Sequence, residues 1–131
     1  QEGGMSLDIG RLIAGGNATV RVSDLDRAIR FYTQVLDLTL VRRAGSGWAL
    51  LDAGRGLLIG LQAGGLAATP ADRERSSAVG LDVGQPLEEV IATLHRRGVH
   101  FHGDIVDAPG AARLAHFADP DGNELYLCER R

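Results

Sequence analysis

The same order of secondary-structure patterns occurs twice along this chain, and this repetition limits its fold more than any other feature. From residue 17 to 63, an alternating strand pattern precedes a helix pattern, and three more strand patterns follow. The same order returns from residue 77 to 131. Internal repetition indicates two copies of one supersecondary unit. We therefore predict an α+β fold in which two β-α-β-β-β units form a curved mixed sheet with helices on the convex face.

Capping signals predict where the helices begin and end. Ser23 or Asp24 can cap the first helix, and Asp37 follows it, where Asp tolerates a left-handed backbone better than most residues. Pro86 at a first helical position and Gly98 at the stop delimit the second helix. The strands are predicted at residues 17–22, 39–43, 48–52 and 57–62, and then at 78–83, 99–101, 113–118 and 124–129.

Both units belong to one predicted domain, residues 17–131. A stretch rich in Gly and Ala separates them, which indicates a linker. Residues 1–16 are predicted to form an N-terminal arm, of which the residues before Met5 are interpreted as a remnant of expression. The parts of the domain are unit one (17–63), the linker (64–76) and unit two (77–131).

The composition argues against several classes of partner. Hydrophobic residues make up 44% of the 131 residues, enough for a core, and the net charge is −3. A negative balance argues against a nucleic-acid surface, and no apolar run approaches the ~20 residues that span a bilayer. We expect neither nucleic acid nor membrane as a partner. The single cysteine, Cys128, cannot form an internal disulfide, so we expect a cytoplasmic protein.

Two segments, one in each unit, resemble those of a known superfamily. His116–Cys128 predicts a strand, a tight turn at residues 119–122 and a second strand, with Gly122 supplying a positive φ. Val20–Tyr32 predicts a strand that leads into a capped helix. Together they resemble the vicinal oxygen chelate superfamily, which includes glyoxalase I, ring-cleaving dioxygenases and bleomycin-resistance proteins.

The resemblance implies a small-molecule pocket on the concave face of the sheet. Period-two alternation indicates the polar and small side chains that face it, although a solvated sheet face would alternate in the same way. Stacking surface could come from the aromatic residues Trp48, Phe101, Phe117 and Tyr126. The candidate ligand-binding residues are Asn17, Arg21, Trp48, Gln62, Asp82, His116, Glu124 and Tyr126.

The resemblance also implies where a metal ion would bind, because metal-dependent relatives place one ligand on each of four strands. The matching positions are Asn17, Gly60 (or Gln62 if the register differs by two), Ala78 and Tyr126. Gly and Ala have no donor atom, and Asn and Tyr are poor ligands for the divalent ions concerned. We therefore predict no metal ligands and no cofactor, and we assign no catalytic residue.

Other ionisable residues leave alternatives open. His100 and His102 can form a metal pair with a carboxylate, or they can lie on one exposed edge face. Asp82 and Glu124, with Arg21 as a partner, can form a structural salt bridge or an acid/base pair.

Three functions fit these observations. We expect a metal-free protein that resembles the bleomycin-resistance branch and sequesters an aromatic or polycyclic small molecule. The alternative is a glyoxalase- or dioxygenase-like enzyme (a lyase, isomerase or oxygenase) that uses metal-free acid/base chemistry or a displaced metal site at Gln62, Asp82, Glu124 and His116. The third is a module without a ligand. A homodimer is expected, because relatives complete their sites by pairing units.

Overall fold

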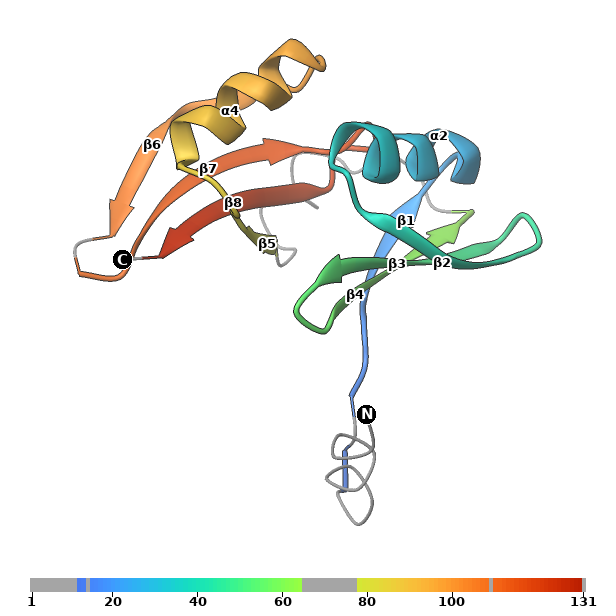
Figure 1. The fold of residues 1–131 in the computed structure, drawn as a ribbon. Helices are drawn as coiled ribbons and strands as arrows, with labels where there is room; N and C mark the ends of the chain where they lie inside the picture. The colour runs from blue at the N-terminus through green and yellow to red at the C-terminus, as the bar shows by residue number, and fades with distance from the viewer. Residues whose placement is uncertain (1–11, 14, 65–77, 109, 131) are drawn as a thin grey trace.

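The computed structural model describes residues 12–13, 15–64, 78–108 and 110–130 (Figure 1). Most of the predicted arm and linker lie outside the described residues. Unit one contains β1 (Ala18–Val22), α2 (Leu25–Arg30), the π-helical turn η1 (Phe31–Val35), β2 (Thr39–Ala44), β3 (Trp48–Gly54) and β4 (Leu57–Ala63). Unit two contains β5 (Val79–Asp82), α4 (Leu87–Arg96), β6 (Phe101–Ala108), β7 (Ala112–Ala118) and β8 (Glu124–Arg130).

Each unit forms its own four-stranded mixed sheet. The strand order is β1-β4-β3-β2 in the first sheet and β5-β8-β7-β6 in the second. In each sheet the first strand pairs in parallel with the last, and the other pairs are antiparallel. Helix α2 covers one face of the first sheet and α4 one face of the second, on the same side of the molecule (Figure 1). The predicted α+β fold of two β-α-β-β-β units is confirmed.

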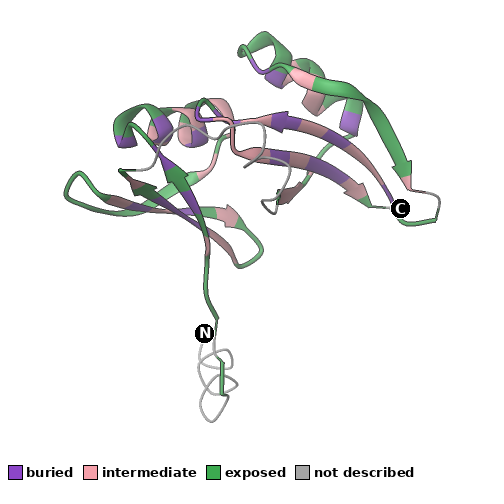
Figure 2. Ribbon diagram, turned by 180° about the vertical axis from the view of Figure 1, so that it is seen from behind, coloured by how far each residue is buried: buried purple, intermediate pink, exposed green. Residues whose placement is uncertain are grey.

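The core lies between the helices and the sheet faces that they cover (Figure 2). Alternation along β1 follows this division, since Val20 and Val22 are buried whereas Thr19 and Arg21 are exposed. The other face of each sheet, opposite its helix, is called the open face below. Both units supply fully buried side chains, among them Tyr32, Leu51, Ile59, Leu61, Leu87, Phe117 and Leu125.

The helix ends follow the predicted signals with one correction. Asp24 caps α2 by accepting a hydrogen bond from Arg27 N at 3.1 Å, and Asp37 takes a φ of 65°. Pro86 precedes α4 as its N-cap, with an extended ψ of 140°, so placing it at the first helical position is wrong. Because proline has no side-chain acceptor, Glu129 Oε2 accepts a hydrogen bond from Leu87 N at 2.9 Å instead.

The main error in the predicted strands is at β6. This strand was predicted at 99–101 and is found at Phe101–Ala108, with a shift of register between His102 and Val106. Gly103 and Asp104 lie within it and disfavour a strand by local propensity. Pairing with β7 outweighs that propensity, and an irregularity is tolerated because β6 is an edge strand.

The turn before β8 is organised by its own aspartate. Asp119 Oδ1 accepts hydrogen bonds from Asp121 N and Asn123 N, each at 2.9 Å, and Gly122 has a φ of 86°. Burial raises the pKa of Asp119, whereas its hydrogen bonds from Asn123 and from Tyr32 lower it. The predicted tight turn with a positive φ at Gly122 is confirmed.

This turn also holds the two units together. Tyr32 Oη on η1 donates a hydrogen bond of 2.8 Å to Asp119 Oδ2. Asp121 Oδ1 accepts from Ser23 N at 3.0 Å and from Arg27 Nη2 at 3.1 Å. Both aspartates are buried. We call these interactions the turn–helix contact. They fix the β7–β8 turn of unit two against the first helix of unit one.

Candidate functional site

The open face of unit two carries a row of residues that crosses all four strands. Gly80 on β5 lies opposite Tyr126 on β8, which lies opposite His116 on β7. His116 in turn lies opposite His102 on β6. The ring centroids of Tyr126 and His116 are 5.5 Å apart. The sheet register therefore brings two predicted site residues into ring contact.

Glu124 adds a carboxylate beside this row. Its Oε2 lies 3.4 Å from Nε2 of His102, and the two side chains are 21% and 49% exposed. An imidazole next to a carboxylate offers both a donor and an acceptor to a polar ligand group. His102 was not among the predicted site residues, because its place on this row follows from the full extent of β6.

Asp82 has a partner that the sequence did not indicate. Its Oδ1 lies 3.2 Å from Nε of Arg130 on β8. Arg21 belongs to the sheet of unit one, and its carbonyl oxygen accepts a hydrogen bond of 2.8 Å from Asn123 Nδ2. The expected pairing of Arg21 with Asp82 and Glu124 is not formed.

The open face of unit one holds the remaining predicted residues. Arg21, Gln62 and Trp48 lie opposite one another on β1, β4 and β3. Arg21 and Gln62 are exposed, and Trp48 is half-buried. Asn17 precedes β1, and its Oδ1 accepts a hydrogen bond of 3.0 Å from Thr19 Oγ1. Within one chain, the candidate residues thus form two groups on two sheets.

An aromatic ring covers a glycine on each open face. A Cβ atom at Gly60 would collide with the Trp48 ring, and one at Gly80 would collide with the Tyr126 ring. The neighbouring strand supplies the ring in both units. The two repeats therefore share one arrangement, in which an aromatic ring packs against the backbone of a glycine on the neighbouring strand.

The residues at the implied metal positions do not fit a divalent ion. Gly60 and Ala78 supply no donor atom, and the Trp48 ring occupies the space beside Gly60. Among the residues that the structure describes, no three His, Cys, Asp or Glu side chains form a group that could hold a metal ion. The displaced set is divided, because Gln62 lies on the first sheet and its other members, Asp82, His116 and Glu124, on the second.

The histidine pair at the start of β6 is not formed. The ring of His100 lies 6.5 Å from that of His95 on α4, whereas His102 faces Glu124 on the open face. His100 precedes the strand, so period-two alternation does not place it beside His102. The two imidazole rings therefore lie in different surroundings, that of His100 near α4 and that of His102 on the open face.

One predicted stacking residue belongs to the core. Phe117 is fully buried, and its ring packs against that of Phe101 at 5.3 Å between centroids. Phe117 therefore offers no surface to a ligand, and its expected role is wrong. Cys128 is buried and free, in agreement with an inert packing role.

Comparisons with known proteins give the same fold. Residues 16–127 match the profile of the Glyoxalase/Bleomycin resistance protein/Dioxygenase superfamily. A superfamily member from Sphaerobacter thermophilus DSM 20745 is 25% identical with a TM-score of 0.68, covering 90% of this chain and 98% of that chain. Comparison with curated protein sequences gave no match.

Two further solved structures share the fold at lower identity. TnmS3, an antibiotic binding protein from Streptomyces sp. CB03234, is 22% identical with a TM-score of 0.69, covering 92% of this chain and 100% of that one. The fosfomycin resistance protein FosX from Listeria monocytogenes, complexed with Mn(II) and sulfate, is 17% identical with a TM-score of 0.72, covering 90% and 91%. None of the helices in the described part of the chain has the length and apolar character of a membrane span.

Proposed function

This chain belongs to the glyoxalase/bleomycin resistance protein/dioxygenase superfamily, and on that premise we propose that it binds an aromatic or polycyclic small molecule without a metal ion. One observation carries the proposal. On each open face, where the resemblance implies metal ligands, an aromatic ring lies against a glycine. Gly60, at one such position, lies beside the Trp48 ring, and Tyr126, at another, lies over Gly80.

The chemistry of the open faces suits a planar ligand. Trp48 and Tyr126 are half-buried, so each ring has a surface left for stacking. His116 extends the Tyr126 surface, since the two rings are in contact. The His102–Glu124 pair beside that row can orient a polar substituent. A few polar groups around aromatic surface are typical of a small-molecule site.

A second copy of the chain would complete the site. The two ring surfaces lie on different sheets, and β1 and β5 each pair with a single strand among the described residues. A strand edge with unpaired backbone groups favours association with another edge. We propose a homodimer in which unit one of each chain lies beside unit two of its partner.

The structural neighbours are consistent with binding of this kind. TnmS3 is described as an antibiotic binding protein, and this chain shares its fold. FosX shares the fold too and is described with Mn(II), so the superfamily also contains metal sites. The metal-dependent alternative is less well supported here, because Gly60 and Ala78 supply no donor atom at two of the four implied ligand positions.

A titration with the fluorescent polycyclic daunomycin, in the presence of EDTA, tests the proposal. Tyr126→Ala should weaken binding by about 1–3 kcal/mol through lost stacking and hydrogen bonding. Tyr126→Phe should lose only the hydrogen-bond part. Val41→Ala is the control, because Val41 is exposed on β2.

Thermal unfolding of each variant separates binding from stability. If Tyr126 were a core residue, Tyr126→Ala would cost about 3–5 kcal/mol of folding free energy. Unchanged affinity in folded Tyr126→Ala would contradict the proposed position of the site. Binding that EDTA abolishes would contradict a metal-free site.

A further inference from the structure

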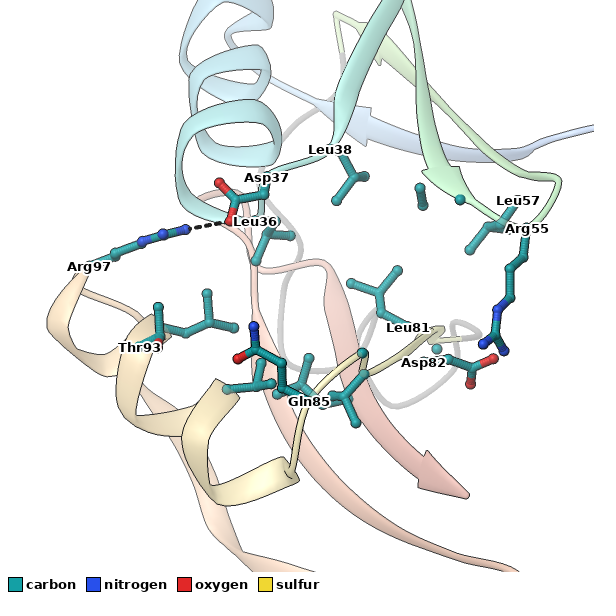
Figure 3. A pocket seen from close by; sticks show the side chains of 18 residues that line it. Leu36, Asp37, Leu38, Arg55, Leu57, Leu81, Asp82, Gln85, Thr93 and Arg97 are labelled. Atoms are coloured by element: carbon teal, nitrogen blue, oxygen red, sulfur yellow. Dashed lines mark hydrogen bonds and ion pairs between the residues drawn. The ribbon is translucent and has the colours of Figure 1, made fainter. Parts of the chain in front are cut away.

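A cavity of about 640 Å³ lies between the two units and borders the open-face row of unit two at Gly80 (Figure 3). Unit one contributes the β3–β4 turn and the residues that follow η1, and unit two contributes β5 and α4. This volume lies within the range of about 300–1,000 Å³ that is usual for small-molecule sites. The apolar part of its lining includes Leu36, Leu38, Leu57 and Leu81.

The repeat explains why this space exists. In unit two, the β7–β8 turn packs on the first helix through Asp119 and Asp121. The equivalent turn of unit one has the sequence Ala-Gly-Arg-Gly at residues 53–56, without a carboxylate. It borders the cavity together with Gly84 and Gln85, the residues that precede α4. The cavity thus stands where a second turn–helix contact would be.

Of the two arginines that line the cavity, one has no ion-pair partner within the described ranges of the chain. Arg97 is paired with Asp37 at 3.0 Å, and Asp82 is paired with Arg130 at 3.2 Å. Arg55, at the tip of the β3–β4 turn, has neither an ion pair nor a hydrogen bond with any residue that the structure describes. Figure 3 shows its side chain at the side of the cavity where Asp82 lies.

The backbone at Arg55 is also unusual. Its φ is 53°, a left-handed conformation that costs free energy for a residue with a side chain. Its neighbours Gly54 and Gly56 have φ values of 95° and 82° and adopt such angles without that cost. Backbone strain of this kind is often found at functional sites. Here it occurs at an arginine whose exposed side chain lies at the edge of a partly apolar cavity.

We propose that this cavity binds an amphipathic monoanion, an aliphatic or aryl carboxylate. The apolar body would lie against the leucine side chains, and the carboxylate would accept hydrogen bonds from the Arg55 guanidinium, which is suited to bidentate contact. This site borders the open-face row at Gly80, but the side chains that would contact the monoanion are not those of the open-face site. Since both units line the cavity, a ligand there would also stabilise their association.

Isothermal titration calorimetry with decanoate, below its micellar concentration, tests the proposal. Decyltrimethylammonium is the matched probe, because it has the same apolar chain with a cationic head. We expect saturable 1:1 binding of decanoate, and at least about tenfold weaker binding of the cation, because the uncompensated charge is positive.

Two variants locate the decanoate. Gly84 borders the cavity, has no strained φ, and a Cβ atom there meets open space, so Gly84→Phe should fill the cavity and abolish binding. Gly47→Phe is its control, because Gly47 is equally open but lies in the β2–β3 turn. Arg55→Gln should weaken binding about tenfold, whereas Arg42→Gln on exposed β2 should leave it unchanged.

Circular dichroism first establishes that each variant is folded. Decanoate affinity that survives in folded Gly84→Phe, or equal affinities in Arg55→Gln and Arg42→Gln, would overturn the proposal. So would the absence of saturable decanoate binding by the unmodified protein. Tyr126→Ala should bind decanoate normally. If Tyr126→Ala alone lost it, decanoate would occupy the open face, so the cavity proposal would fail while the proposed function stood.

Discussion

At the scale of single residues, positive φ angles mark the places where this chain changes direction. Asp37 ends the first helix at 65°, Gly98 ends α4 at 94°, and Gly122 closes the turn before β8 at 86°. A β carbon is crowded in this conformation. Glycine has no β carbon and adopts it freely, and aspartate tolerates it better than most residues. The geometry of the turn–helix contact therefore depends on small or short side chains at a few positions.

Gly122→Val should show that dependence. A β-branched residue resists a positive φ, so we expect a loss of about 1–3 kcal/mol in the free energy of unfolding, measured by urea denaturation. Gly47→Val is the matched control, because Gly47 is also in a turn but has no positive φ and space for a side chain. Equal losses in the two variants would show that φ at Gly122 is unimportant.

Residue type predicted some of these positions and not others. Asp37 and Gly122 were identified because Asp and Gly are the residues that tolerate left-handed backbone. Arg55 was not, since arginine has no such preference, and the flanking glycines indicated only a turn. The partners of charged groups could not be predicted from the sequence either. Asp82 pairs with Arg130, which is 48 residues away in the sequence, and this contact depends on the register of β5 with β8.

At the scale of elements, periodicity and caps predicted both helices and most strands to within a residue or two. Strand β6 was the exception, because its stability comes from β7 rather than from its own sequence. The row from Gly80 to His102 could be predicted only in part for the same reason. Alternation assigns a side chain to a face, but the register decides which side chains meet.

The turn–helix contact should contribute to stability through Asp121. Asp121→Ala would leave the Ser23 amide without its buried acceptor and remove the partner of Arg27, so we expect a loss of about 2–4 kcal/mol in unfolding free energy. Asp26→Ala is the control: Asp26 lies on the same helix and pairs with Arg43 at the surface, where such pairs contribute less than about 1 kcal/mol.

Urea denaturation of both variants gives the comparison directly. The loss of unfolding free energy in Asp121→Ala should be clearly larger than the loss in Asp26→Ala. A loss in Asp121→Ala no greater than that in Asp26→Ala would mean that the units are held together elsewhere, for example by Arg97, which donates to the Val35 carbonyl oxygen at 2.8 Å.

At the scale of the whole molecule, the repeat was evident in the sequence, but the association of its copies was not. Nothing in the local pattern indicates that one turn carries carboxylates to the other unit's helix while its counterpart borders a cavity. The candidate binding residues were selected for a single concave face, and one chain distributes them over two sheets. They can act as one site only if a partner chain brings the two sheets together. Otherwise the two groups of residues serve separate surfaces.

Sedimentation velocity at micromolar concentration tests the proposed homodimer. We expect a species of twice the chain mass, because β1 and β5 are edge strands whose association would bring Trp48 of one chain near Tyr126 of its partner. A monomer as the sole species would contradict the dimer, and would leave the two open faces as separate surfaces.

The range of the turn–helix contact along the chain has a consequence for folding kinetics. Every strand pair in the described part of the chain closes within its own unit, whereas Ser23 and Asp121 are 98 residues apart. Each sheet can therefore form through short loops, and the long loop closes once, when the units dock. The Ser23 amide, bonded only across that closure, would report by its hydrogen-exchange rate how often the docked halves part while both sheets stay intact.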